Sequence, residues 1–119
     1  MFTALLDANV LVPISLTDTL LRAAENELFQ PRWSTDILRE TEAAIQRIRP
    51  DVAPASMRSR LEAMDGRFPD ASVIQYDSLI PGIALPDPKD RHVVAAAIAG
   101  HADIIVTRNL KDFPPAYPI

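Results

Sequence analysis

The stretch Leu5-Leu6-Asp7-Ala8-Asn9-Val10-Leu11-Val12 places a charged residue inside an apolar run near the start of the chain. The residues just before it, from Ala4 to Leu6, are continuously apolar, which is typical of a strand buried on both faces of a parallel sheet. Asp7 would then lie at the carboxyl end of that strand, where open α/β sheets hold their ligands. No Lys or Arg precedes Arg22, so the local sequence offers this carboxylate no cationic partner.

Length and composition limit the classes of function. The chain has 119 residues, of which 48% are hydrophobic, and this predicts one folded domain spanning residues 1–119. The formal net charge of -4 argues against nucleic-acid binding through a wholly basic surface, but it leaves room for a local basic patch. Cysteine is absent and only two histidines occur, so a metal site would use mainly oxygen ligands, which suit Mg²⁺ or Mn²⁺. No apolar run approaches the roughly 18 residues of a membrane span, and no signal peptide is visible, so we expect a cytoplasmic protein.

The predicted elements alternate between strands and helices. The predicted strands are 2–7, 28–33, 72–76 and 103–107. The predicted helices are 19–27, 35–48, 55–64 and 88–99. A loop containing three prolines is expected at 79–88. This alternation predicts the α/β class, with a parallel sheet and right-handed crossovers, and Pro31 favours a peripheral position for the second strand.

Capping residues set most of the predicted helix boundaries. Asp18, Ser34 and Asp87 are expected N-caps, because a short polar side chain there accepts a hydrogen bond from the first turn. Pro88 fits the first helical position after Asp87, and Gly66 is the expected C-cap of the third helix.

The apolar faces of the helices direct two further acids toward the sheet. On the helix at 35–48 the face consists of Ile37, Thr41, Ala44, Ile45 and Ile48. Glu40 falls on this face, with no basic residue four positions away, so it is a second carboxylate predicted to point toward the core. On the helix at 88–99 the predicted buried stripe is Val93, Val94, Ala97 and Ile98. Asp90 lies at the head of that stripe.

Four acids are expected to meet at one edge of the sheet. The strand at 103–107 is predicted to be fully buried, and Asn109 and Asp112 follow its carboxyl end. If it neighbours the first strand, Asp7, Glu40, Asp90 and Asp112 would reach one crevice. Crowded carboxylates raise each other's pKa values, and a divalent cation removes that penalty. Mg²⁺ held by one or two carboxylates and water activates water for attack on a phosphodiester.

The sequence resembles the PIN-domain family in four blocks that follow the family's order and spacing. The blocks are Leu6 to Leu11, Ser34 to Glu40, Leu85 to Val93 and Ile105 to Pro114. PIN domains are metal-dependent ribonucleases, and many small bacterial members are VapC-type toxins of toxin–antitoxin pairs. The resemblance implies a three-layer α/β/α fold around a central parallel sheet of four or five strands. Three prolines in residues 114–119 disfavour the usual fifth edge strand, so four strands are expected.

The resemblance also implies the roles of particular residues. Asp7, Glu40 and Asp90 match the first three acidic positions of a site for Mg²⁺ or Mn²⁺. Members differ over the fourth acid, which lies at the position of either Asn109 or Asp112; we assign it to Asp112 and give Asn109 a polar contact.

Other expectations concern the substrate and the partners. The resemblance implies that Asn9 orients the acidic cluster. Arg91, Arg108 and Lys111 lie beside the acidic blocks and are expected to hold the scissile phosphate of RNA. The arginines of the middle third of the chain, Arg47 among them, are expected to be mostly solvated, with some of them guiding the RNA backbone. The family further implies a protein antitoxin as partner, and its members commonly form homodimers.

Plainer interpretations of the same residues stay open. In these interpretations Asp7 caps a following turn, Glu40 swings to the edge of its helix and contacts solvent, and Asp112 pairs with Arg108. Asp87 is expected to be a cap rather than a ligand. The two histidines, at positions 92 and 101, are expected to pack or to contact solvent.

Two other functions compete with the nuclease. A phosphatase of the haloacid-dehalogenase type would use Asp7 as nucleophile, although the second aspartate of that motif is replaced by Asn9. A non-catalytic PIN-like binding module would keep the acids without performing chemistry.

Overall fold

A four-stranded parallel sheet forms the centre of the computed structural model, which describes residues 1–85 and 87–108. The strands, in spatial order, are β3 (Ser72–Val73), β2 (Gln30–Ser34), β1 (Thr3–Leu6) and β4 (Ile104–Val106). Each neighbouring pair is parallel, so all carboxyl ends lie at the same edge. The first and last strands are neighbours, which is the condition on which the expected meeting of the acids depended, and Leu6 lies opposite Val106.

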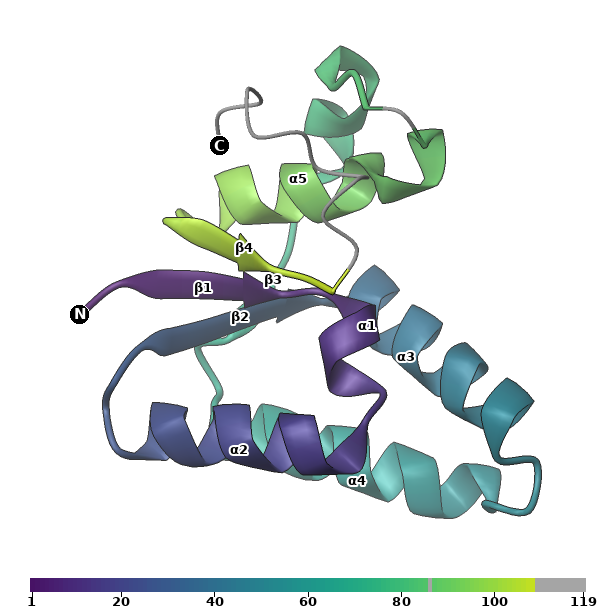
Figure 1. Ribbon diagram of the computed structural model, residues 1–119. Helices are drawn as coiled ribbons and strands as arrows, with labels where there is room; N and C mark the ends of the chain where they lie inside the picture. Colours follow the sequence, from purple (N-terminus) through teal and green to yellow (C-terminus); the bar gives the residue numbers. More distant parts are fainter. Residues whose placement is uncertain (86, 109–119) are drawn as a thin grey trace.

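Helices cover both faces of this sheet, which confirms the predicted α/β class (Figure 1). On one side lies α5 (Arg91–Ala99), against which the 3₁₀ helix η1 (Asp77–Gly82) packs. On the other side lie α2 (Ile14–Glu25) and α4 (Pro54–Arg67). The remaining helices, α1 (Ala8–Leu11) and α3 (Thr35–Ile48), stand at the carboxyl end of β1, and η2 (Pro88–Asp90) leads directly into α5. None of the helices in the described ranges is long and apolar enough to cross a membrane.

The core is built around β1 and α5. Leu5 and Leu6 are fully buried, as expected for a strand covered on both faces. In α5 every residue from Val93 to Ala97 is buried, because the helix is enclosed between the sheet and η1. The predicted stripe is therefore right for Val93, Val94 and Ala97. It is wrong for Ile98, which is 40% exposed near the end of the helix.

The segment after β1 differs from the prediction. Asp7 caps the four-residue helix α1, and α2 then begins at Ile14 rather than after Asp18. Pro13, with φ near -70°, supplies the fixed backbone angle that starts α2. The Thr17 hydroxyl donates to the carbonyl of Leu11 (2.8 Å) and so ties the two helices together.

Two other predicted boundaries are wrong. Gly66 lies inside α4, which ends at the C-cap Phe68, and no described glycine has the positive φ of a left-handed cap. Phe68 instead packs edge-on against Trp33, with ring centroids 6.2 Å apart. The strand predicted at 72–76 stops after Val73, because Gln75 turns the chain with a φ of 59°.

The positions of β2 and β4 in the sheet also differ from the prediction. β2 lies between β1 and β3, and its proline is tolerated because β3 pairs only with Trp33 and Ser34, beyond Pro31. β4 was expected to be fully buried, yet Ile104 is 43% exposed. Its one pairing partner within the described residues is β1, so one of its edges lacks a neighbouring strand there. The question of a fifth strand falls on residues 109–119, which lie outside the described residues.

Candidate active site

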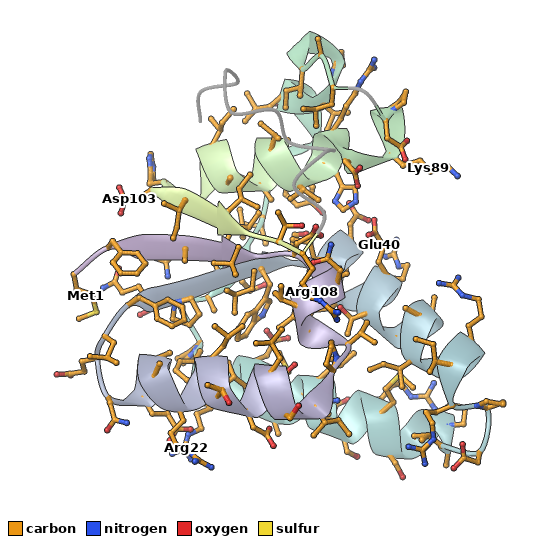
Figure 2. All side chains as sticks on the ribbon, in the orientation of Figure 1. Met1, Arg22, Glu40, Lys89, Asp103 and Arg108 are labelled. Atoms are coloured by element: carbon orange, nitrogen blue, oxygen red, sulfur yellow. The ribbon has the colours of Figure 1, made fainter. Side chains whose placement is uncertain are left out.

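A pocket of about 470 Å³ lies at the carboxyl end of the central strands. Five of the predicted site residues line it: Asp7, Asn9, Glu40, Asp90 and Arg108. Figure 2 shows Glu40 and Arg108 at the same end of the sheet, opposite the end that carries Met1 and Asp103. Three other predicted residues, Asn109, Lys111 and Asp112, lie outside the described residues.

Asp7 is held in a fixed orientation at the floor of this pocket. Its backbone N–H donates to the carbonyl of Val106 (3.1 Å), which continues the pairing of β1 with β4. One side-chain oxygen accepts from the N–H of Ala8 (2.8 Å) and the other from the hydroxyl of Thr107 (3.0 Å). The residue is only 6% exposed. Asp7 is therefore a helix cap and a pocket residue at once, so the plainer interpretation is also correct.

Burial raises the pKa of the Asp7 carboxyl above its ordinary value. The hydrogen bonds from Ala8 and Thr107 oppose this rise in pKa, while the negative charge of Glu40 adds to it. No Lys or Arg side chain is hydrogen-bonded to Asp7 in the described part of the chain. A cation bound in the pocket would stabilise the ionised Asp7 carboxylate and so lower its pKa.

Asn9 and Thr107 extend the hydrogen-bond network across the pocket floor. The Asn9 amide donates to the Thr107 hydroxyl (3.0 Å), which in turn donates to Asp7. The backbone N–H of Arg108 donates to the Asn9 carbonyl oxygen (3.0 Å). Asn9 thus links α1 to the segment after β4 and fixes the hydroxyl that orients Asp7.

Glu40 does not point into the core as predicted. Its side chain is 46% exposed, and it hydrogen-bonds through Oε1 to Nε2 of His92. The helical periodicity is right for Ile37, Thr41 and Ile45, which are buried, but Glu40 stands at the edge of that face. Ile48, predicted to belong to the same face, is 62% exposed because it is the last residue of α3.

Three acids influence the imidazole of His92. Burial of the ring lowers its pKa, but the hydrogen bond that it donates to Glu40 and the charges of Glu40, Asp36 and Asp7 together raise the pKa above its usual value. When protonated, His92 places positive charge beside Glu40, and this charge opposes the rise in the pKa of Asp7.

Asp87 is the predicted helix cap, whereas Asp90 lies at the pocket. Asp87 is the N-cap of η2, accepting from the N–H of Lys89 (2.9 Å), with Pro88 at the first position. Asp90 comes at the end of η2, immediately before α5, rather than in the third position of a longer helix. It is the third acid on the wall of the pocket.

The acids of the pocket would supply only part of the coordination shell of a divalent cation. Asp7, Glu40 and Asp90 share one pocket, but no three acid or histidine side chains of residues 1–85 and 87–108 are close enough to form a complete metal site. Mg²⁺ commonly uses one or two carboxylates and completes its shell with water. The donor set fits such a partly hydrated ion.

The sequence did not indicate that Thr107 and His92 belong to the site, and it included Arg47 only within a wider group of arginines. Arg47 lines the pocket two helical turns after Glu40, a spacing that places both on one side of α3. Thr107 was detectable because it follows β4 as Asp7 follows β1. His92 was considered a packing residue, and nothing in its local sequence indicates a partner 52 positions away.

A family model with the description PIN domain matches residues 3–111. No curated protein gives a significant match, and neither does any solved structure.

Proposed function

The chain belongs to the PIN-domain family, whose members are generally metal-dependent nucleases, and on this premise we propose that it is an endoribonuclease that needs Mg²⁺ or Mn²⁺. The observation that carries the proposal is the pocket shared by Asp7, Glu40 and Asp90, in which Asp7 is buried and has no cationic hydrogen-bond partner among the described residues. The reaction is hydrolysis of a phosphodiester bond of RNA.

The acids divide into two roles in this proposal. Asp7 and Asp90 are the ligands that hold the cation, because they lie at the ends of β1 and η2, which are anchored by backbone hydrogen bonds. Glu40, at the rim, and Asp112 hold water or a second ion. The bound cation supplies activation of water and charge neutralisation at the phosphate.

Two arginines on the pocket wall support a nucleic-acid substrate. Arg108 and Arg47 line the same pocket as the acids, and in this proposal they contact phosphate oxygens of the bound RNA. Asn9 fixes the backbone of Arg108, and Lys111 and Asn109 are proposed to add a further phosphate contact and a polar contact.

Cleavage of single-stranded RNA by the purified protein with Mn²⁺ tests this function. In Asp7→Asn the side-chain amide can still cap α1 and contact Thr107, but the negative charge is removed, so RNA cleavage should be lost. Asp18→Asn removes one charge from an exposed position of α2 and is the matched control, which should cut normally. Equal cutting by wild type and Asp7→Asn would overturn the proposal.

A non-catalytic binding module is the alternative, since no three of the described acid or histidine groups form a complete metal site. That module would bind RNA without cutting it and would show no Mn²⁺ binding by calorimetry. The phosphatase hypothesis lacks comparable support, because the PIN-domain match spans residues 3–111.

We further propose that the protein is the toxin of a toxin–antitoxin pair. In this proposal the antitoxin binds an apolar groove. The groove, of about 540 Å³, is lined chiefly by Val12, Ile14, Ile45, Ile48 and Met57. Ile14 and Ile48 are 60% and 62% exposed, and Nη2 of Arg60, which also lines the groove, is buried without a partner among the described residues. An amphipathic helix carrying an acidic residue would satisfy both features.

Expression in a host cell tests the toxin role. Wild type should stop growth, and the product of a neighbouring reading frame should restore it. Ile14→Asp should prevent that rescue while preserving RNA cleavage, because Ile14 lines the groove but not the acidic pocket; rescue of the variant to the same extent would exclude the groove. The homodimer common in the family is part of the same proposal and is measurable by light scattering.

A further inference from the structure

His92 contacts a residue of the acidic pocket but does not itself line the pocket. The residues lining the pocket include Glu40 and Asp90 but not His92. The His92 side chain is 12% exposed, and its Nε2 is hydrogen-bonded to Oε1 of Glu40. Nδ1 is buried and has no hydrogen-bond partner among the described residues, so Glu40 is the group there that fixes the ring.

Glu40 needs such an anchor to act on the pocket. Its side chain is long, sits on the exposed edge of α3 and is 46% exposed, so it would otherwise sample several rotamers in solvent. The contact with His92 engages one carboxylate oxygen and leaves the second oxygen available to the pocket. The contact also joins α3 to the start of α5, two elements that carry different acids of the site.

We infer that His92 is a positioning residue that holds Glu40 toward the cation-binding pocket through its Nε2 atom. This inference rests on the proposed function, because it gives Glu40 a purpose only if the pocket receives a divalent cation. Partners of this kind, which orient a carboxylate without touching the ion, change metal affinity by roughly 10- to 100-fold in other metal sites.

Mn²⁺ titration calorimetry on the full chain tests the inference. His92→Leu keeps an apolar side chain of similar bulk but loses the donor, and it should weaken Mn²⁺ binding about tenfold. His92→Gln places an amide nitrogen near the position of Nε2 and should restore most of the affinity. His101→Asn alters the exposed second histidine, at a φ of 55° that asparagine tolerates, and should bind Mn²⁺ as wild type does.

A double-mutant cycle separates positioning from packing. If His92 acts through Glu40, His92→Leu should cause no further loss of affinity in a Glu40→Ala background. Equal Mn²⁺ affinity of wild type and His92→Leu, additive losses in the cycle, or failure of His92→Gln to restore affinity would each overturn the inference. Absence of Mn²⁺ binding by wild type would overturn the proposed function as well, so the two failures are distinguishable.

Discussion

The hydroxyl of Thr107 donates a 3.0 Å hydrogen bond to the carboxylate of Asp7, a residue 100 positions earlier in the chain. The contact is possible because β1 and β4 are parallel neighbours that end in register at Leu6 and Val106. The same hydroxyl accepts from the amide of Asn9. The pocket floor therefore depends on one small side chain at the end of the last described strand.

Thr107→Val should destabilise the protein by about 1–3 kcal/mol, because the shape is kept while a buried carboxylate loses a donor. The Thr107 bond opposes the rise of the Asp7 pKa, so the variant should raise that pKa further. Urea unfolding and titration of Asp7 by NMR measure the two effects. Thr107→Ser retains the hydroxyl and should stay near wild type; identical unfolding of the valine variant would show that the bond contributes nothing.

Asp7→Asn should make the metal-free protein more stable than wild type at neutral pH. Burial raises the pKa of Asp7 in the folded state, so its favourable contribution is complete below the ordinary carboxyl pKa and is lost as the pH rises through the folded value. The difference between variant and wild type should therefore vanish below about pH 4. Thermal unfolding in a chelator across this pH range provides the measurement.

Added Mn²⁺ should reverse that order of stability. At a concentration of 100 times its Kd, a ligand of the folded state adds about 2.7 kcal/mol. Wild type should gain this stabilisation, and Asp7→Asn should gain little. A variant that is stabilised as strongly as wild type would show that Asp7 is not a ligand.

Arg108→Glu should weaken RNA binding and reduce its salt dependence. Each phosphate contact on a single strand contributes a slope of about 0.7 in log affinity against log salt concentration. Binding is best measured in the Asp7→Asn background, so that the RNA stays intact. Arg22→Glu is the matched control, because Arg22 is exposed on α2, away from Glu40 and Arg108 (Figure 2). If the two charge reversals weakened RNA binding equally, the effect of Arg108→Glu would come from the net charge of the protein and not from a phosphate contact.

Gly100→Ala should cost about 1–3 kcal/mol of stability through overpacking. A Cβ at Gly100 would stand 2.7 Å from Cγ2 of Val73 and 3.1 Å from the carbonyl oxygen of Ala96. Gly66→Ala is the opposite case, since its Cβ would meet nothing within 4 Å inside α4, and it should stabilise by about 0.5–1 kcal/mol. Chemical denaturation of both variants tests the pair, and equal shifts would contradict the packing argument.

The parts of the fold that were predicted depend on short-range chemistry. The helix at 35–48 was predicted with its N-cap Ser34, which accepts from the N–H of Ile37 (3.1 Å). The buried strand before Asp7 and the Asp87–Pro88 start were equally local, because apolar runs and caps act within a few residues. These features also located Asp7 and Asp90.

The parts that were wrong depend on what surrounds an element. Glu40 was predicted to face the core from periodicity alone, but its orientation is set by His92, which belongs to another helix. The exposure of Ile98 and Ile104 likewise depends on which neighbours cover the ends of α5 and the edge of β4. The role of Asp112 concerns residues outside the described ranges and stays a prediction.

The pairing of β1 with β4 also sets an order of events during translation. The ribosome synthesises Asp7 100 residues before Thr107, which follows β4. In the meantime the nascent chain can form helices and local contacts, but it cannot form the pocket floor. Any activity that depends on that floor is therefore withheld until β4 and Thr107 have left the exit tunnel.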